Sequence, residues 1–426
     1  MSSTDLLTPI LDGAIRSIKF FNGRLLTGED LTQEQKANRE ARDRLGQAMG
    51  HGVAHGLEVT IHQGAAKPTV TVQPGLAINR HGKALRLHTA VDVSLVQSAG
   101  GAAPAKGAPQ AGSFATCLPP QTAAYTNPAI VFLLTLGPVQ ATEGTTQISG
   151  LGSGASACNA RYLVDALELR LVELDFSVEL ADTAHLAQLR NRLASRAFGY
   201  TTARAFATDP FGATPAPAKL LDTLTTADLR PGEVPLAALY WTAASGVVFV
   251  DTWSVRRPVA GAGGAWPWSA HLDPHRLAEA TAMLLQFQGQ IDDLRAASSS
   301  AAPPSTLAAT SAFQYLPPAG VLPIGGAQGF ALATFFGGLT VRNPPSGDPL
   351  FIEGAKVESL LRTSLGYPPI DLSSGEMVFV YHVRENVQAL QGANPPLEYV
   401  VFATGQMPYF GDARFNIAHW NYSSWS

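Results

Sequence analysis

Charge is scarce in this sequence. Asp, Glu, Lys and Arg make up 15% of its 426 residues, whereas an average soluble domain carries roughly 25%. The net charge is −4, and Lys and Arg do not gather into the basic patch that a nucleic-acid-binding protein needs. Low charge together with 40 glycines and 30 prolines indicates a turn-rich chain that places much of its surface against partners.

Cysteine and long apolar runs are scarce as well. Cys117 and Cys158 are too few for a disulfide framework; they either pair with each other or stay reduced, as is usual in the cytosol. No apolar run approaches the ~20 residues that cross a bilayer, and Met1–Asp5 lacks the basic start of a signal peptide. We expect a chain made in the cytoplasm without membrane insertion; if it ends up outside the cell, it leaves by lysis or as part of a particle.

Recognisable catalytic chemistry is missing too. The sequence contains no Gly-x-Ser-x-Gly elbow and no Walker lysine. Gly150–Gly154 imitates a dinucleotide fingerprint, but it follows polar residues rather than a strand. His51 and His55 lack the zincin glutamate and lie between glycines, so a metal clip is only an alternative to ordinary solvated histidines. We therefore predict no catalytic residue, no cofactor and no metal ligand.

The patterns that are present predict a mainly β fold with a few helices (α+β). Short alternating strands follow one another between residues 57 and 95, and Ile130–Leu136 is apolar enough for a buried strand. Tyr162–Leu174 alternates cleanly and favours a strand, although a helix of period 3.6 also fits it. Val234–Trp241 and Gly246–Val255 indicate an antiparallel pair.

Five segments are expected along the chain. They are a head segment at 1–95, a β-rich domain with loop insertions at 96–258, a heptad helix at 272–295, a linker at 296–306 and a C-terminal β-sandwich-like domain at 307–426. Within the last domain we expect strands at Phe330–Phe336, Leu350–Ile352, Glu376–Val383 and Tyr399–Thr404, and a helix at Lys356–Ser364. Each β domain would then have a core of its own.

The helix predicted over Glu29–Gln47 is unusually polar. Thr27 suits its N-cap and Asp30 completes a capping box, while Gly46 and Gly50 offer stops. Its apolar residues are few, so no conventional core face holds it. It is either a solvated helix laid across a domain edge or a helix that docks onto other subunits through its polar side chains.

The residues around this helix form the most specific pattern in the chain. They are Phe20-Phe21-Asn22-Gly23-Arg24-Leu25-Leu26-Thr27, Asp30-Leu31, Glu34-Gln35, Gly52-Val53, Gly56-Leu57, Val59, Val72–Ala77 and Arg80–Gly82. The pattern resembles the head segment of baseplate-associated, adaptor or cage-type proteins of phage tails and contractile injection systems. Further similarities to that family lie at Trp253 with Arg256-Arg257, at Leu316–Gly320 and at Ala413–Phe415. The resemblance implies a structural subunit of a phage-tail-like contractile injection particle.

A heptad pattern marks the helix that begins at Asp273-Pro274. Its seam, spaced 3-4-3-4-3, consists of Leu277, Ala280, Leu284, Phe287, Ile291 and Leu294. The helix either packs on its own domain or pairs with a neighbouring subunit. On the second interpretation, Leu284→Asp together with Phe287→Asp abolishes assembly and leaves each β domain folded.

The predicted assembly interface combines the head segment with this seam. Its residues are Phe20, Phe21, Arg24, Leu31, Gln35, Asn38, Leu277, Leu284, Phe287, Ile291 and Leu294. Partners would be further copies of the chain and baseplate, sheath or fibre proteins. Near the C-terminus, Trp420, Tyr422 and Trp425 either join their own core or contact a partner or a cell-surface glycan.

Two alternative functions belong to other classes. A receptor- or glycan-binding fibre component of the same kind of particle would use the three C-terminal aromatic residues as stacking surfaces. A polysaccharide-degrading enzyme is disfavoured, because the sequence marks no acid/base pair of carboxylates.

Overall fold

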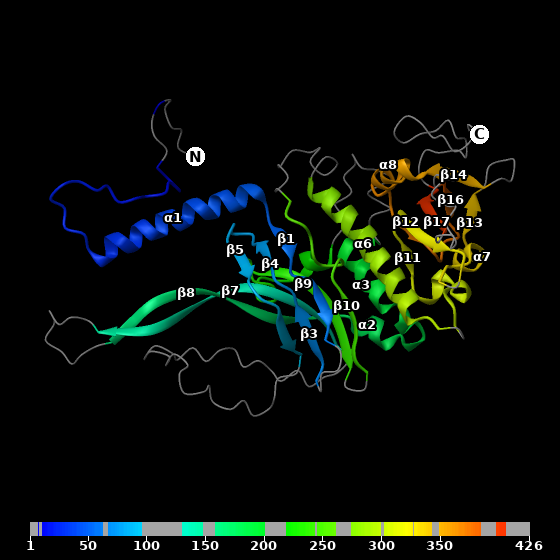
Figure 1. The fold of residues 1–426 in the computed structure, drawn as a ribbon, viewed down its shortest axis with the longest axis horizontal. Coiled ribbons are helices and arrows are strands. Elements are labelled where there is room, and N and C mark those ends of the chain that lie inside the picture. Colours follow the sequence, from blue (N-terminus) through cyan, green and yellow to red (C-terminus); the bar gives the residue numbers. More distant parts are fainter. Residues whose placement is uncertain are drawn as a thin grey trace, which may run out of the picture.

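The computed structural model is mainly β with several helices, which confirms the predicted fold class (Figure 1). The described residues are 7, 11–62, 67–95, 130–147, 158–200, 219–242, 245–260, 274–299, 302–326, 328–342, 349–384 and 398–405. A long helix and a two-stranded ribbon extend to the same side of the body (Figure 1).

The head begins with α1 (Gly28–Met49) and continues as two small antiparallel sheets. One sheet contains β1 (Gly52–Gly56), β4 (Gly75–Ile78) and β5 (Ala84–Leu87) in the order β1-β4-β5. The other contains β2 (Val59–Ile61), β3 (Thr69–Val72) and β6 (Val91–Ser94) in the order β2-β3-β6. The alternating patterns between residues 57 and 95 are thus confirmed as short strands.

A four-stranded antiparallel sheet lies at the centre of the molecule. Its strands are β7 (Ile130–Gln147), β8 (Cys158–Leu174), β9 (Val234–Thr242) and β10 (Gly246–Asp251), in the order β10-β9-β7-β8. The strand interpretation of Tyr162–Leu174 and the pairing of β9 with β10 are therefore correct. β7 extends to Gln147 instead of ending at Leu136, and its outer half leaves the body together with β8 as the ribbon (Figure 1).

The two faces of this sheet bury different cores. Phe132 and Leu134 of β7 face the head strands, whereas Val131 and Leu133 face a layer of helices. This layer is made of α2 (Ser177–Ala181), the 3-10 turns η1 (Thr183–Gln188) and η2 (Leu220–Thr223), and α3 (Leu189–Phe198). Alternation along a strand sends successive side chains to opposite faces, so one strand serves both cores.

The C-terminal part is a five-stranded mixed sheet with helices on both faces. Its elements are η3 (Pro304–Thr306), η4 (Ala309–Ser311), β11 (Tyr315–Leu316), β12 (Ala319–Ile324), α7 (Leu332–Phe335), β13 (Thr340–Arg342), β14 (Leu350–Glu353), α8 (Gly354–Ser364), β15 (Ile370–Asp371), β16 (Met377–Arg384) and β17 (Glu398–Thr404). The sheet order is β12-β17-β16-β13, and β14 also pairs with β16. β13 and β14 run parallel to β16, whereas the other pairs of this sheet are antiparallel.

Each face of the C-terminal sheet buries a core of its own. Val380 and Phe402 face a core that includes α7, whereas Phe379 and Tyr381 face a core that includes α8. The two-stranded sheet of β11 and β15 joins the first of these cores through Leu316 and Ile370, so a small second sheet as well as helices covers that face. The expected strand at Phe330–Phe336 is wrong, because most of it forms the single turn α7.

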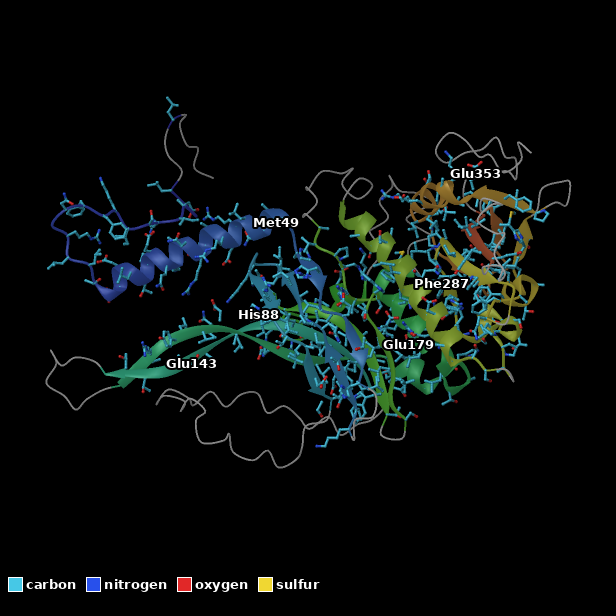
Figure 2. All side chains as sticks on the ribbon, in the orientation of Figure 1. Met49, His88, Glu143, Glu179, Phe287 and Glu353 are labelled. Carbon is cyan, nitrogen blue, oxygen red and sulfur yellow. The ribbon has the colours of Figure 1, made fainter. Side chains whose placement is uncertain are left out.

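The heptad helix is α6 (Pro274–Ala297), and it lies inside the molecule between the central sheet and the C-terminal part (Figure 2). Phe287 is 1% exposed and Ile291 is 0% exposed. The Phe287 ring lies 5.4 Å from the rings of Phe313 and Phe402, centroid to centroid. The interpretation of a free seam is therefore corrected at these two positions, because the chain's own core covers them.

Placing Phe287 in this core changes what its substitution does. We predict that Phe287→Ala lowers the free energy of unfolding by about 3–5 kcal/mol, as is usual when a buried ring is removed. Phe287→Asp would unfold the C-terminal part rather than separate intact subunits. Thermal denaturation measures the loss, and Phe21→Ala is the matched control because that ring is 62% exposed. Equal melting temperatures for the two variants would contradict the buried position.

Candidate assembly surface

The capping box predicted for the long polar helix is present. The Thr27 hydroxyl accepts a hydrogen bond from the Asp30 backbone N–H at 3.1 Å, and the Asp30 carboxylate accepts one from the Thr27 backbone N–H at 3.0 Å. Arg24 donates to the same carboxylate at 2.5 Å. The hydrogen bond from the Thr27 backbone, aided by Arg24, holds the pKa of Asp30 below its usual value. These contacts fix where α1 begins.

The segment before α1 runs back along the helix and is tied to it by polar contacts. The backbone N–H of Ile18 donates to Glu34 at 3.2 Å, and the Gln33 side chain donates to the Arg16 carbonyl at 3.2 Å. Arg44 donates to the Gly13 carbonyl nearer the end of the helix. Residues 11–49, called the arm below, therefore form one projecting unit (Figure 1).

The arm carries an unusual share of the exposed apolar side chains. Half of the exposed large hydrophobic residues in the described part of the chain lie within the first 49 residues: Leu7, Leu11, Phe20, Phe21, Leu25, Leu26, Leu31, Leu45 and Met49. Leu25 is 90% exposed and Phe21 is 62% exposed. Such a concentration on one projecting element is typical of a surface that another molecule covers.

The end of α1 is seated on the turn between β4 and β5. A Cβ on Gly46 would lie 2.0 Å from the carbonyl oxygen of Gly82, and a Cβ on Gly82 would lie 1.8 Å from that of Asp43. Gln47 donates to the His81 carbonyl at 3.0 Å. Gly46 is therefore not a stop signal; it allows close packing against the turn, and Gly50 is the residue that caps the helix.

The second half of the head pattern is framework rather than surface. The Val53 N–H donates to the Arg257 carbonyl at 2.9 Å, and Arg256 donates to the Gly56 carbonyl at 2.6 Å. A Cβ on Gly52 would lie 2.7 Å from the Arg257 carbonyl oxygen. The backbone of Gly52-Val53 and Gly56-Leu57 thus binds Arg256 and Arg257, called the Arg pair below. About two hundred residues separate the two segments in the sequence.

Arg256 is buried and Arg257 is half-buried, and both lie against aromatic rings. Arg256 lies 5.4 Å from the Trp253 ring, and Arg257 lies 4.6 Å from the Phe198 ring. Burial lowers the pKa of both guanidinium groups. Arg257 donates to the carbonyls of Trp253 and Ser254 at 2.7 and 3.0 Å, so its charge is compensated by ring faces and backbone dipoles.

The ribbon formed by β7 and β8 projects beside the arm (Figure 1). On its outer half Tyr162 is 52% exposed and Leu163 is 55% exposed, and Glu143 lies far out toward its tip (Figure 2). Asp165 accepts hydrogen bonds from Lys83 at 2.9 Å and from Gln140 at 3.3 Å. The hydrogen bond from Lys83 lowers the pKa of Asp165 most, and the charge of Arg39 on α1 adds to it. Residues of the β4–β5 turn and of the arm thus both lower the pKa of this carboxylate.

The predicted interface residues fall into two groups in space. Phe20, Phe21, Leu31, Gln35 and Asn38 are exposed on the arm, and Arg24 is half-buried there. Leu284 and Leu294 of α6 are half-buried, and Phe287 and Ile291 are core residues. Leu277 lies in α6, but its side chain lies outside the described residues, as do Trp420, Tyr422, Trp425 and Cys117.

The ribbon was missed as a candidate surface. The alternation of Tyr162–Leu174 predicted a strand, and the exposed residues at its start were the signal that one end has no core to face. The outer part of β7 was also missed. The glycines between Gln140 and Ala157 favour a loop in the sequence, whereas β7 continues to Gln147 in the structure.

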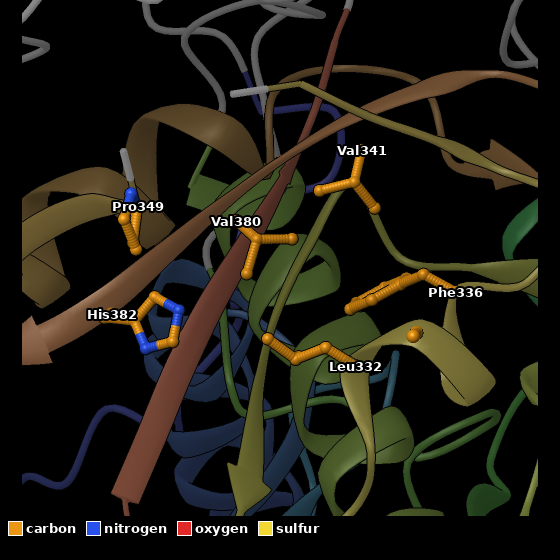
Figure 3. A pocket seen from close by; sticks show the side chains of 7 residues that line it. Leu332, Phe336, Val341, Pro349, Val380 and His382 are labelled. Carbon is orange, nitrogen blue, oxygen red and sulfur yellow. The ribbon is translucent and has the colours of Figure 1, made fainter. Parts of the chain in front are cut away.

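A hollow of about 290 Å³ lies at the edge of the C-terminal sheet (Figure 3). Its lining consists of Leu332, Ala333, Phe336, Val341, Pro349, Val380 and His382. The His382 ring also lies 5.8 Å from that of Phe351. A sugar-binding site usually needs several convergent polar groups, and this lining supplies only the imidazole.

Other binding chemistry is sparse in the parts of the chain that the structure describes. There, no group of three or more His, Cys, Asp or Glu side chains is placed to hold a metal ion. Among the same residues, no helix combines the length and the apolar character needed to cross a membrane.

Comparison with known proteins gives weak similarities only. No family model and no curated protein matches the sequence. Among solved structures, the crystal structure of TssK is 9% identical with a TM-score of 0.26, and the match covers 67% of this chain but only 51% of that one.

Two related structures give similar values. The TssK-TssF-TssG baseplate subcomplex of the type VI secretion system is 12% identical over 67% of this chain and 73% of that chain, with a TM-score of 0.26. The baseplate complex from the type VI secretion system is 10% identical over 66% and 70%, with a TM-score of 0.25. TM-scores of this size do not establish a shared overall fold.

The packing of α1 against the turn at Gly82 leads to a specific prediction. Gly82 has a φ of +80° and no room for a Cβ, so Gly82→Ala should cost the docked helix about 1–3 kcal/mol. We expect hydrogen exchange of the α1 amides to become about tenfold faster or more, while the central sheet keeps its protection. Gly28→Ala is the control, because nothing lies within 4 Å of its Cβ position. Unchanged exchange in Gly82→Ala would contradict the seat.

Proposed function

We propose that this chain is a structural subunit, not an enzyme, of a phage-tail-like contractile injection particle. It is a baseplate-associated, adaptor or cage component, assembled in the cytoplasm, whose arm docks onto another subunit. The supporting observation is that the apolar residues of the head pattern are exposed on the arm, Phe20, Phe21 and Leu31 among them. A fold that leaves these side chains uncovered needs a partner to cover them.

The head pattern divides into two halves with different tasks. Its Gly-Val and Gly-Leu residues hold the Arg pair inside the molecule. Its Phe-Phe and Leu-Leu residues do not contribute to the core of the described chain, since all four are more than half exposed. Folding alone therefore accounts for the Gly-Val and Gly-Leu residues, whereas docking explains the Phe-Phe and Leu-Leu residues.

The energetics require a broad docking surface. Burying a fully exposed Leu or Phe contributes about 1.5–3 kcal/mol, and association costs an estimated ~4–15 kcal/mol in lost freedom. One side chain in one pocket is too little to hold a subunit. The arm meets the requirement only if most of its apolar side chains are covered together, which fits a groove or a helical neighbour on the partner.

This docking can be tested by substitution on the arm. We predict that Phe21→Ser with Leu25→Ser lowers incorporation into sedimenting particles about tenfold or more, because two exposed side chains lose most of their burial. The melting temperature should stay within about 2 °C, since surface substitutions rarely change stability much. Particles are pelleted from host lysate and the chain is quantified by mass spectrometry.

The matched control is Val178→Ser with Tyr399→Ser, two exposed residues outside the arm. Normal incorporation of the arm variant would remove the arm from the docking surface. If the unaltered chain itself stays in the small soluble fraction, the proposal of a particle subunit fails as a whole.

A further inference from the structure

β8 lies at the edge of the central sheet. In the order β10-β9-β7-β8 this strand is terminal, and no strand of the described residues pairs with its outer side. The segment Arg161–Asp165 of this strand lies at the edge of the sheet, where outward-facing backbone N–H and C=O groups offer a template for a further strand.

The outer half of this edge has exposed side chains as well. Ala160–Leu163 and Asp165 are all exposed. Tyr162 and Leu163 are large apolar residues, and on an unprotected edge they promote non-specific pairing. A specific occupant therefore has to match both the apolar residues and the charges of this segment.

Symmetry restricts how β8 can pair with its own copy. In an antiparallel pair around a two-fold axis, residue i lies opposite residue j and the sum i + j is constant. Backbone groups that point out of the sheet edge alternate along a strand. Only an even sum brings the outward groups of both copies together, so the axis must pass through a residue and not between two residues.

An axis through Leu163 gives a self-complementary register. Arg161 then lies opposite Asp165 of the second copy, and the same pair occurs twice. Tyr162 lies opposite Val164, an aromatic and β-branched pair of the kind that stabilises neighbouring strands. Leu163 meets its own copy at the centre, so each exposed side chain of the segment gains a matching neighbour.

Other axes are less favourable. An axis through Arg161 or Asp165 places like charges directly opposite each other, which destabilises a strand pair. An axis through Leu167 pairs Arg161 with Glu173, but it sets the exposed Leu163 against Leu171, which the chain's own core already covers.

The carboxylate that this register uses can accept the contact. Asp165 Oδ1 receives the hydrogen bonds from Lys83 and Gln140, whereas Oδ2 receives none from the described residues. The Asp165 side chain is 49% exposed. Arg161 contacts the Tyr162 ring at 5.0 Å, so its guanidinium already lies at the exposed segment.

We propose that the chain forms a symmetric dimer in which β8 pairs antiparallel with β8 of a second copy about an axis at Leu163. The two central sheets then join edge to edge into one continuous sheet, with the arms of both copies on the same face. The dimer does not depend on the proposed role in a particle, and it is measured on the purified full chain.

Cross-linking tests the register directly. In a Cys117→Ser, Cys158→Ser background, Leu163→Cys should give a covalent dimer with a short thiol cross-linker, because opposite Cβ atoms lie about 4.5–5.5 Å apart. Ala160→Cys and Leu167→Cys should give none, since each is offset from its copy by at least six residues, roughly 20 Å. Links at residue 160 or 167, or none at residue 163, would overturn the register.

Charge-reversal substitutions test the same residue pairs without a cross-linker. Arg161→Asp and Asp165→Arg should each weaken the homodimer about tenfold, because each sets two like-charged pairs face to face. Mixing the two variants should restore dimers, since the mixed pair recovers both contacts. Native mass spectrometry distinguishes the species, and circular dichroism checks that each variant is folded. A monomeric unaltered chain, or mixing without effect, would overturn the proposal.

Discussion

The buried carboxylate of Asp251 is the interaction on which the arrangement of the molecule depends. It is 0% exposed and accepts hydrogen bonds from Arg190 of α3 at 2.7 Å, from Gln286 of α6 at 2.9 Å and from the backbone N–H of Ser254 at 2.9 Å. An ionised group is tolerated inside a protein only when donors surround it, and removing one buried partner costs about 3–5 kcal/mol. Because the donors come from different elements, one carboxylate fixes the central sheet, α3 and α6 together.

The elements that bind Asp251 also position the C-terminal part and the head. Toward the C-terminus, Gln290 of α6 donates to the Ala312 carbonyl at 3.2 Å, and the Asn191 side chain of α3 binds the backbone of Tyr315. Toward the head, the chain that follows Asp251 supplies the Arg pair that holds β1. The arm and the C-terminal sheet are therefore positioned by neighbours of the same buried group.

The sequence predicted the local patterns well and the tertiary partners poorly. Thr27 and Asp30 form the expected capping box because both partners lie within one turn. The heptad spacing of α6 is real, but spacing cannot tell whether Phe287 meets another copy or Phe402, more than a hundred residues later. Gly46 looked like a helix stop because its reason for being glycine, the backbone of Gly82, is distant in the sequence. Whether the side chains of the arm are exposed likewise depends on how distant parts of the chain fold, which local sequence patterns do not encode.

The distribution of charge along the chain balances the exposed apolar residues of the arm. Charged residues make up 15% of the whole sequence, yet nine of the 22 residues of α1 are charged. Exposed apolar segments aggregate unless charged residues flank them. The polar helix follows directly on the Phe-Phe and Leu-Leu residues and is bound to their segment by Glu34 and Gln33. Its polarity, which no core of the described residues requires, therefore counters aggregation of the exposed apolar segment.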